Sequence, residues 1–203
     1  MAKVVGANPT TRFLVGPFVV GYQMVKTPTT IFCPPIKTDK LIMLEVIQQW
    51  VNHVAQSYLS PPGRVLEIGS MDFNGSVREY FTEATEYIGI DMQAGKGVDI
   101  VMPSTACISK WGQEAFDVVL CLEVLEHDRT FWRTVEDMRL LVKRGGHMII
   151  STPGYHFPYH GYPKDYYRFS EDTYNEFFFA GWNKIEAVSF DHGSTIGVIG
   201  KRP

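Results

Sequence analysis

The sequence has little of the cysteine, charge or repetition that would identify a class of protein directly. Its 203 residues include three cysteines, Cys33, Cys107 and Cys121, and this odd number at wide spacing forms neither a disulfide framework nor a zinc-binding pattern. We therefore expect a reducing compartment. There is no internal repeat or low-complexity tract, and the net charge of -3 argues against a large electrostatic surface for nucleic acid.

Long apolar segments are also missing from the sequence. The longest, at residues 13–25, is interrupted by Gly16, Pro17 and Gly21, and it is too short to span a bilayer. The same segment starts too far into the chain, and with too little positive charge before it, for a signal peptide. The sequence therefore predicts a cytoplasmic protein that does not bind membranes.

The glycine fingerprint of dinucleotide-binding proteins is absent as well. In residues 64–76 an apolar run ends in Glu67 and Gly69, and a small polar turn follows. A buried strand that leads into a tight turn and a helix N-terminus is how α/β proteins build a nucleotide pocket. However, Met71 and Asn74 stand where G-x-G-x-x-G needs its second and third glycines. Taken alone, this turn predicts only a ligand site at the carboxyl end of a strand.

The first part of the chain, residues 1–37, differs in composition from the rest. Prolines alternate there with β-branched and aromatic residues, so that segments 13–15 and 18–20 could form a short hairpin. The region could equally be an extended arm that packs on the core or on a second copy of the chain, because an apolar arm is rarely left in water. We expect a packed N-terminal extension rather than a lid, then one folded domain over residues 38–203.

The rest of the chain alternates between helix and strand patterns. A helix is expected over residues 40–58, where Leu44, Ile47, Val51, Val54 and Tyr58 share one face. Strands are expected at 65–69, 87–91, 98–102, 116–122 and 147–151, with helices at 74–81, 104–111 and 128–143 between them. Segments 182–190 and 195–200 close the chain as an antiparallel pair. The pattern predicts a doubly wound α/β fold, with a mostly parallel seven-stranded sheet, an antiparallel C-terminal edge and helices on both faces.

Polar side chains stand where these expected strands end. Asp91 is placed to accept hydrogen bonds from a ribose diol, although an aspartate here can also be a simple turn residue. Glu67 ends a buried strand, so it needs either a cationic ligand group or a neighbouring loop as its partner. His127 follows the fourth strand and is either a general base or a helix cap. Asp117 belongs to the opposite end of that strand and is expected to be structural.

A long segment after the fifth strand, residues 155–169, concentrates aromatic and polar side chains. Such loops are often functional, and this composition suits a small ligand or a sugar face. His160 is a second candidate base. In the alternative interpretation the aromatic residues anchor the loop and Arg168 pairs with Asp165. His156 lies nearby, but the spacing of these groups matches no metal site, and we expect no metal. The candidate substrate-binding residues are Tyr155, His156, Tyr162, Asp165, Tyr166 and Arg168.

These elements, in this order and spacing, resemble the class I S-adenosylmethionine-dependent methyltransferases over about residues 64–200. Each motif is weak, but the ordered set is specific. The resemblance is to a branch in which E-I-G-S is followed by an N-G-S turn and a G-Y-P-x-D-Y-x-R-F loop, here at residues 67–70, 74–76 and 161–169. It implies a Rossmann-like fold, S-adenosylmethionine as methyl donor and S-adenosylhomocysteine as product.

The resemblance also implies a set of cofactor residues. The methionine end and the turn that holds it would involve Glu67, Gly69, Ser70, Asn74 and Gly75. The ribose and the adenine would contact Asp91 and Met92, respectively. The residues near the reactive methyl group would be Cys121, Leu122 and Glu123. The family often has an acid followed by a small residue after the third strand, where this chain has Pro103 and Ser104. Proline offers no carboxylate and no N–H, so either backbone groups near Ser104 bind the adenine or cofactor affinity is reduced.

Several acceptors are disfavoured by what the sequence omits. No [DNS]-P-P-[YFW] segment follows the fourth strand, which argues against methylation of amino groups in DNA, and no Pro-Cys nucleophile occurs for cytosine C5. The resemblance then implies a small-molecule or sugar-containing acceptor that is methylated at oxygen or nitrogen. Positioning and exclusion of water can supply most of the acceleration, and a base is needed only if the acceptor must lose a proton.

Two other classes of function compete with this one. A non-catalytic binding or structural module of the same fold is suggested by Pro103 and by the apolar N-terminus. A nicotinamide-dependent oxidoreductase is disfavoured by the missing glycine fingerprint. The sequence therefore favours the methyltransferase.

Overall fold

The computed structural model describes residues 40–59, 61–73, 75–161 and 164–203. The extension predicted for residues 1–37 lies outside these residues, as do Asn74 and Tyr162 from the predicted site. The helices are α1 (Lys40–Tyr58), α2 (Cys107–Trp111), α3 (Phe131–Leu141) and α4 (Glu171–Thr173), with short helical turns η1 (Arg78–Phe81), η2 (Ser104–Ala106), η3 (Leu125–His127), η4 (Tyr174–Phe178) and η5 (Asp191–Gly193). Within the described part of the chain, no helix is both long enough and apolar enough to cross a membrane.

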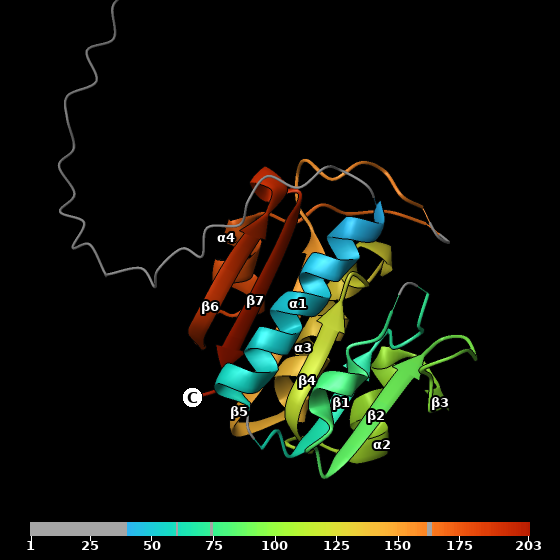
Figure 1. Cartoon of the computed structure of the whole chain (residues 1–203). Helices are drawn as coiled ribbons and strands as arrows, with labels where there is room; N and C mark the ends of the chain where they lie inside the picture. Colours follow the sequence, from blue (N-terminus) through green and yellow to red (C-terminus); the bar gives the residue numbers. More distant parts are fainter. Residues whose placement is uncertain (1–39, 60, 74, 162–163) are drawn as a thin grey trace, which may run out of the picture. The chain divides into compact units, whose positions relative to one another are not determined.

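One sheet of seven strands forms the centre of the fold (Figure 1). Its strands are β1 (Arg64–Ile68), β2 (Glu86–Asp91), β3 (Ile100–Val101), β4 (Phe116–Leu122), β5 (Val142–Pro153), β6 (Asn183–Phe190) and β7 (Thr195–Lys201). The order across the sheet is β3-β2-β1-β4-β5-β7-β6, and only the β5–β7 and β6–β7 pairs are antiparallel. The predicted Rossmann-like sheet with an antiparallel C-terminal edge is confirmed.

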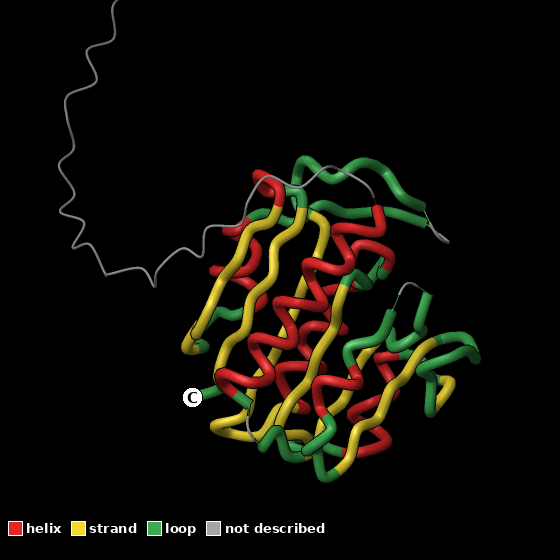
Figure 2. Tube along the Cα trace, viewed as in Figure 1, coloured by secondary structure: helices red, strands yellow, loops and turns green. Residues whose placement is uncertain are grey.

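Helices cover both faces of this sheet, with α1 on one face and α3 on the other (Figures 1 and 2). Successive residues of a strand point to opposite faces of the sheet, so adjacent side chains pack into different hydrophobic layers. Val118 and Leu120 pack with the apolar face of α1, whereas Val119 and Cys121 pack with α3. On α1, Ile47, Val51 and Val54 are buried as predicted, but Tyr58 is 37% exposed, and its hydroxyl donates to Glu186. These two buried layers hold the carboxyl ends of the strands in fixed positions.

Two expected helices are shorter than predicted, for local reasons. In place of a helix over 74–81 there is only η1, because the Asp72 carboxylate accepts a hydrogen bond from the Gly75 N–H at 2.8 Å and Gly75 has a φ of +117°. Helix α3 starts at Phe131 rather than at 128, because Asp128 accepts from the Thr130 N–H in a turn before the helix. Asp and Asn side chains commonly compete with helix formation in this way.

Candidate functional site

The sequence-predicted residues gather at the carboxyl ends of the parallel strands. β1 lies between β2 and β4, so the chain crosses over in opposite directions on either side of it, which is where α/β sheets bind ligands. The loop of residues 154–169 returns across the same edge (Figure 1). The Tyr166 N–H donates to the Glu126 carbonyl at 2.8 Å, and this bond joins the loop to η3. The site therefore has a turn on one side and a loop on the other.

The turn after β1 approaches its neighbours so closely that only glycine fits. Gly69 has a φ of +78°, and the N–H groups of Gly69 and Ser70 both donate to the Ile90 carbonyl. A Cβ added at Gly97 would lie 2.5 Å from the Ser70 carbonyl oxygen, and one added at Gly89 would lie 2.5 Å from the Gly97 carbonyl oxygen. Sequence reasoning missed Gly89 and Gly97, although the G-K-G at residues 95–97 is a visible signal of close backbone approach.

Glu67 is a buried acid beneath this turn. Its side chain accepts a hydrogen bond from the Tyr87 hydroxyl at 2.7 Å, and Arg78 stacks over the Tyr87 ring while binding Asp99. Burial raises the pKa of Glu67 to about 7, against the opposing effect of the Tyr87 hydrogen bond. A carboxyl group in this state would ionise fully if a cationic ligand group came beside it.

The Glu67 carboxyl is expected to make the protein less stable as pH rises. Its folded pKa of about 7 exceeds its ordinary 4.5, so its contribution is fully present below pH 4.5 and is lost as pH rises to 7. Glu67→Gln keeps an acceptor for Tyr87 and removes the titration. We expect the fall in the free energy of unfolding between pH 5 and pH 8 to be smaller in the variant by about 2 kcal/mol, measured by urea denaturation.

A matched control for this experiment is Glu86→Gln. Glu86 starts β2, its side chain is 48% exposed, and it pairs with Arg64. This variant should keep the pH dependence of the original protein. Equal pH dependence in Glu67→Gln and the original protein would mean that Glu67 is ionised in the folded state.

The run after β4 places two acids at the site. Glu123 has a φ of +53°, and its N–H donates to the Ser151 carbonyl at 3.0 Å. Glu126 in η3 is fully buried, and among the described residues neither of its carboxylate oxygens has a hydrogen-bond partner. Burial raises the pKa of both carboxyl groups well above the ordinary value. Burying such groups without hydrogen bonds costs several kcal/mol, so Glu126 in particular calls for an explanation.

The two candidate bases meet at Glu126. His127 Nε2 and His160 Nε2 each lie 3.4 Å from the same oxygen, Glu126 Oε1, and the two rings are 4.9 Å apart. His127 Nδ1 hydrogen-bonds the Lys164 carbonyl, and His160 Nδ1 lies 3.1 Å from an oxygen of Asp165. Burial lowers the pKa of His127, so its imidazole is neutral at neutral pH. Sequence reasoning selected both histidines and missed Glu126, although it directly precedes His127.

Arg168 holds the loop together. Its guanidinium binds both carboxylate oxygens of Asp165, at 2.5 and 2.6 Å, and donates to the carbonyls of Phe157 and Pro158 at 3.0 and 2.8 Å. These bonds hold the pKa of Asp165 down to about 2. The pairing of Arg168 with Asp165 is the one foreseen in the alternative interpretation of this segment. Of the other predicted substrate residues, Tyr155 and Tyr166 are 83% and 44% exposed, and His156 is exposed.

The remaining predicted cofactor residues are spread along the same edge. Asp91 ends β2, and one of its carboxylate oxygens accepts the Gln93 N–H at 3.0 Å; Met92 beside it is 76% exposed. The Ser104 hydroxyl lies 2.8 Å from the Thr134 hydroxyl, so this side chain is engaged with α3. Cys121 is fully buried at the end of β4, and burial raises the pKa of its thiol. Its neighbour along the strand, Leu122, is half-buried.

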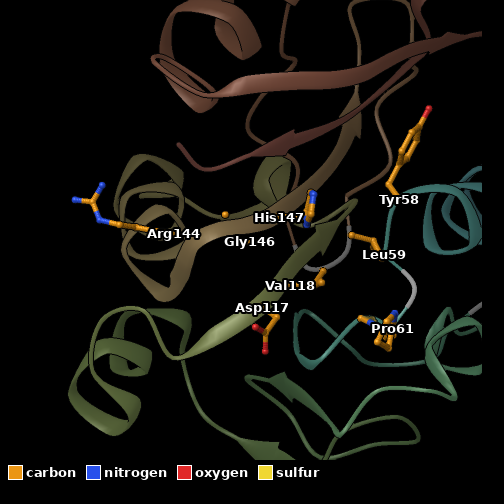
Figure 3. Close-up of a pocket in the computed structure, with 10 residues that line it drawn as sticks. Tyr58, Leu59, Pro61, Asp117, Val118, Arg144, Gly146 and His147 are labelled. Carbon is orange, nitrogen blue, oxygen red and sulfur yellow. The ribbon is translucent and has the colours of Figure 1, made fainter.

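A hollow of about 230 Å³ lies at the opposite edge of the sheet, by the amino ends of β4 and β5 (Figure 3). Arg144 points away from the other lining side chains. Asp117, also in the lining, accepts hydrogen bonds from the Arg64 N–H and the Lys143 amine, at 2.8 and 2.9 Å. The predicted structural role of Asp117 is confirmed, and its charge is already paired. The sequence-predicted site residues lie at the other edge of the sheet.

The chain is similar to known proteins in sequence and in fold. The model of a family described as a methyltransferase domain matches residues 42–183. The 1,6-didemethyltoxoflavin-N1-methyltransferase of Burkholderia thailandensis, solved with 1,6-didemethyltoxoflavin and S-adenosylhomocysteine bound, has a TM-score of 0.64 at 15% identity, covering 80% of this chain and 81% of that chain. The N-methyltransferase NodS of Bradyrhizobium japonicum WM9, in complex with S-adenosylhomocysteine, has a TM-score of 0.56 at 14% identity over 81% and 89%. No curated protein matches the chain in sequence.

Proposed function

Because this chain belongs to the methyltransferase-domain family, we propose that it transfers a methyl group from S-adenosylmethionine to a small-molecule or sugar-containing acceptor, at oxygen or nitrogen. The chain is an S-adenosylmethionine-dependent methyltransferase, and S-adenosylhomocysteine is its product. One observation carries the proposal for the acceptor. The imidazoles of His127 and His160 converge at the carboxyl edge of the sheet, beneath a loop that exposes aromatic side chains.

The residues on the β1 and β2 side of the edge fit this cofactor. The buried carboxyl of Glu67, with its raised pKa, suits a partner such as the ammonium of the methionine end. Gly69 and Ser70 shape the turn, with Asn74 and Gly75 beyond it. Asp91 keeps one carboxylate oxygen that the Gln93 N–H does not use, and a ribose diol would donate to it. When bound, S-adenosylmethionine supplies a methyl carbon on a positively charged sulfur.

The adenine and methyl ends follow along the same edge. The exposed Met92 packs on the adenine, and because the Ser104 hydroxyl is engaged with Thr134, backbone groups near Ser104 bind the adenine amine in place of the missing acid. Cys121, Leu122 and Glu123 flank the methyl end. The buried thiol of Cys121 keeps its proton, so its part is to fill space rather than to react.

The acceptor lies between η3 and the loop. Among the described residues, Tyr155, His156 and Tyr166 form its surroundings, and Asp165 with Arg168 fixes the part of the loop on which these three stand; Tyr162 of the same loop lies outside the described residues. His127 is the first candidate to take the acceptor proton, because the Lys164 carbonyl binds its Nδ1–H and leaves the Nε2 lone pair free. His160 is the second. The 1,6-didemethyltoxoflavin bound in the Burkholderia thailandensis structure and the net charge of -3 both support a small acceptor over nucleic acid.

His127→Ala is expected to lower turnover by about 100-fold or more, which is the usual contribution of a general base. Affinity for S-adenosylhomocysteine should stay unchanged, because His127 belongs to the acceptor side. The measurement is transfer of a labelled methyl group to a panel of hydroxylated and amino small molecules, oligosaccharides, RNA, DNA and protein, with calorimetry for the cofactor product. Label that enters only nucleic acid or protein would contradict the proposed acceptor class, and full activity of the variant would remove His127 as the base.

A further inference from the structure

We infer that Glu126, His127 and His160 form a binding site for a divalent transition-metal ion, with Zn²⁺ as the representative ion. The assignment of the ion to these side chains is independent of the reaction. Its role in holding an acceptor rests on the proposed function. The site is distinct from the cofactor residues, because η3 and the loop supply all three ligands.

Glu126 is buried without a hydrogen-bond partner among the described residues. Its side chain has no exposed surface, and within the described part of the chain neither oxygen accepts a hydrogen bond. A buried carboxyl group is normally hydrogen-bonded, paired or bound to a metal, because burial without a partner is costly. Two imidazole nitrogens face it at 3.4 Å, which is longer than an ordinary hydrogen bond. No direct hydrogen bond from the described residues compensates for burying this group, and a bound cation would supply the partner that it lacks.

The possible ligand atoms of Glu126, His127 and His160 lie close together. One donor atom from each of the three residues lies within 4.8 Å of the other two. Zn²⁺ binds imidazole nitrogen and carboxylate oxygen at about 2.0–2.1 Å in tetrahedral sites, so neighbouring ligand atoms are about 3.3 Å apart. The distances from His127 Nε2 and His160 Nε2 to Glu126 Oε1 are both 3.4 Å. Two edges of the ligand set thus already have the length that the ion requires.

The second nitrogen of each imidazole faces an oxygen outside the ligand set. His127 Nδ1 bonds the Lys164 carbonyl, and His160 Nδ1 faces Asp165 at 3.1 Å. A carboxylate or backbone carbonyl on the far nitrogen is the usual arrangement for metal-bound histidine, because it fixes the ring and the tautomer. Arg168 in turn holds Asp165 through two hydrogen bonds. The Lys164 carbonyl thus fixes the His127 ring with its Nε2 on the side of Glu126, whereas His160 Nδ1 lies close to Asp165 without a hydrogen bond among the described residues.

The ligand types and their exposure suggest what the ion would do. Two imidazoles and one carboxylate suit Zn²⁺ and similar ions better than Mg²⁺ or Ca²⁺, which prefer oxygen. The side chains of His127 and His160 are 19% and 15% exposed, so a fourth position can open toward solvent. With His127 Nε2 used as a ligand, the ion would take the place of His127 as the activating group: an acceptor hydroxyl bound there would lose its proton to water more readily, because a bound cation lowers the pKa of the oxygen.

The test uses the untagged full-length protein, treated with a chelator and then freed of it. Calorimetry with zinc chloride alone should show one saturable site per chain, and Co²⁺ should give the visible absorption of a tetrahedral site. Glu126→Gln and His160→Gln should each weaken Zn²⁺ binding by at least about 100-fold, since each removes a ligand. Affinity for S-adenosylhomocysteine should be unchanged in both variants.

His53→Ala is the matched control. His53 Nε2 also lies 3.4 Å from a glutamate oxygen, that of Glu186, but there is only one histidine in that pair and its side chain is 44% exposed. This variant should bind Zn²⁺ as the original protein does. The metal-free Glu126→Gln protein should melt at the same temperature as the metal-free original or higher, because an unpaired buried carboxyl has been replaced by an amide. A loss of Zn²⁺ binding in that variant is then not a loss of fold.

Each result decides between the two proposals. Absence of saturable Zn²⁺ binding in the original protein, or equal binding by Glu126→Gln, overturns the metal site even if methyl transfer is found. One Zn²⁺ per chain that is lost in both ligand variants supports the site even if no small acceptor is methylated, and only the proposed function then fails. Turnover that falls on chelation and returns with Zn²⁺ supports the role of the ion at the acceptor.

Discussion

Asp91→Ala is expected to weaken binding of S-adenosylhomocysteine by about 100-fold in calorimetry. A ribose diol donates two hydrogen bonds to a carboxylate in this position, and bonds to a charged group contribute about 1.5–3 kcal/mol each. A loss of about 3 kcal/mol corresponds to about 100-fold in affinity. The effect should be large because Asp91 ends β2 at the carboxyl edge of the sheet, in a position that the register with β3 fixes.

Two further variants separate the ribose contact from effects on the fold. Asp91→Asn keeps an oxygen for the Gln93 N–H and should weaken binding by about 10-fold, because it loses one charged acceptor. Glu86→Ala removes an acid from the same strand at its opposite end and should leave the affinity unchanged. If Asp91→Ala binds as tightly as the original protein, the ribose site has been misplaced.

Gly69→Ala is expected to destabilise the protein by about 2–5 kcal/mol. A φ of +78° costs a residue with a side chain about 1–2 kcal/mol, and the added Cβ would lie 2.2 Å from Val124 Cγ2, an overlap that costs about 1–3 kcal/mol more. The melting temperature should fall by on the order of 10 °C. Affinity for S-adenosylhomocysteine should fall as well, because the displaced Val124 lies next to Glu123.

Gly145→Ala is the matched control for the backbone. Gly145 has a φ of +75°, but an added Cβ there would meet nothing within 4 Å, so this variant shows only the conformational cost. Gly69→Ala combined with Val124→Ala removes the overlapping methyl groups and should recover part of the lost stability and affinity. Equal melting temperatures of the Gly69 and Gly145 variants would show that the turn can move away from Val124.

The sheet could be predicted from the sequence, because buried parallel strands are short apolar runs. The run at residues 116–122 became β4 with the same bounds, and 182–190 and 195–200 became the antiparallel edge almost unchanged. The 74–81 helix could not be predicted correctly, since its outcome depends on whether Asp72 caps a turn or a helix. Helix propensity and turn formation compete there within a small free-energy difference.

The separate parts of the candidate site could be predicted from the sequence, but the way in which they come together could not. The position of His127 at the end of β4 follows from the apolar run before it, and the loop of His160 follows from its composition. That both imidazoles meet at Glu126 depends on how the loop returns to η3, through the bond from the Tyr166 N–H. A contact between residues 34 positions apart has no local signal, and no pattern of spacing distinguishes it from an unpaired surface histidine.

The hydrogen bonds of Arg168 also determine whether the loop loses conformational entropy during folding or on ligand binding. The guanidinium joins Asp165 to the carbonyls of Phe157 and Pro158, so the two described parts of the loop, residues 154–161 and 164–169, are held by contacts with each other. A loop that is ordered during folding loses little further freedom when a ligand arrives, and this preorganisation favours both tight binding and shape selectivity. The acceptor would therefore bind to a preformed surface, and acceptors of similar polarity would be distinguished by how well their shape fits it.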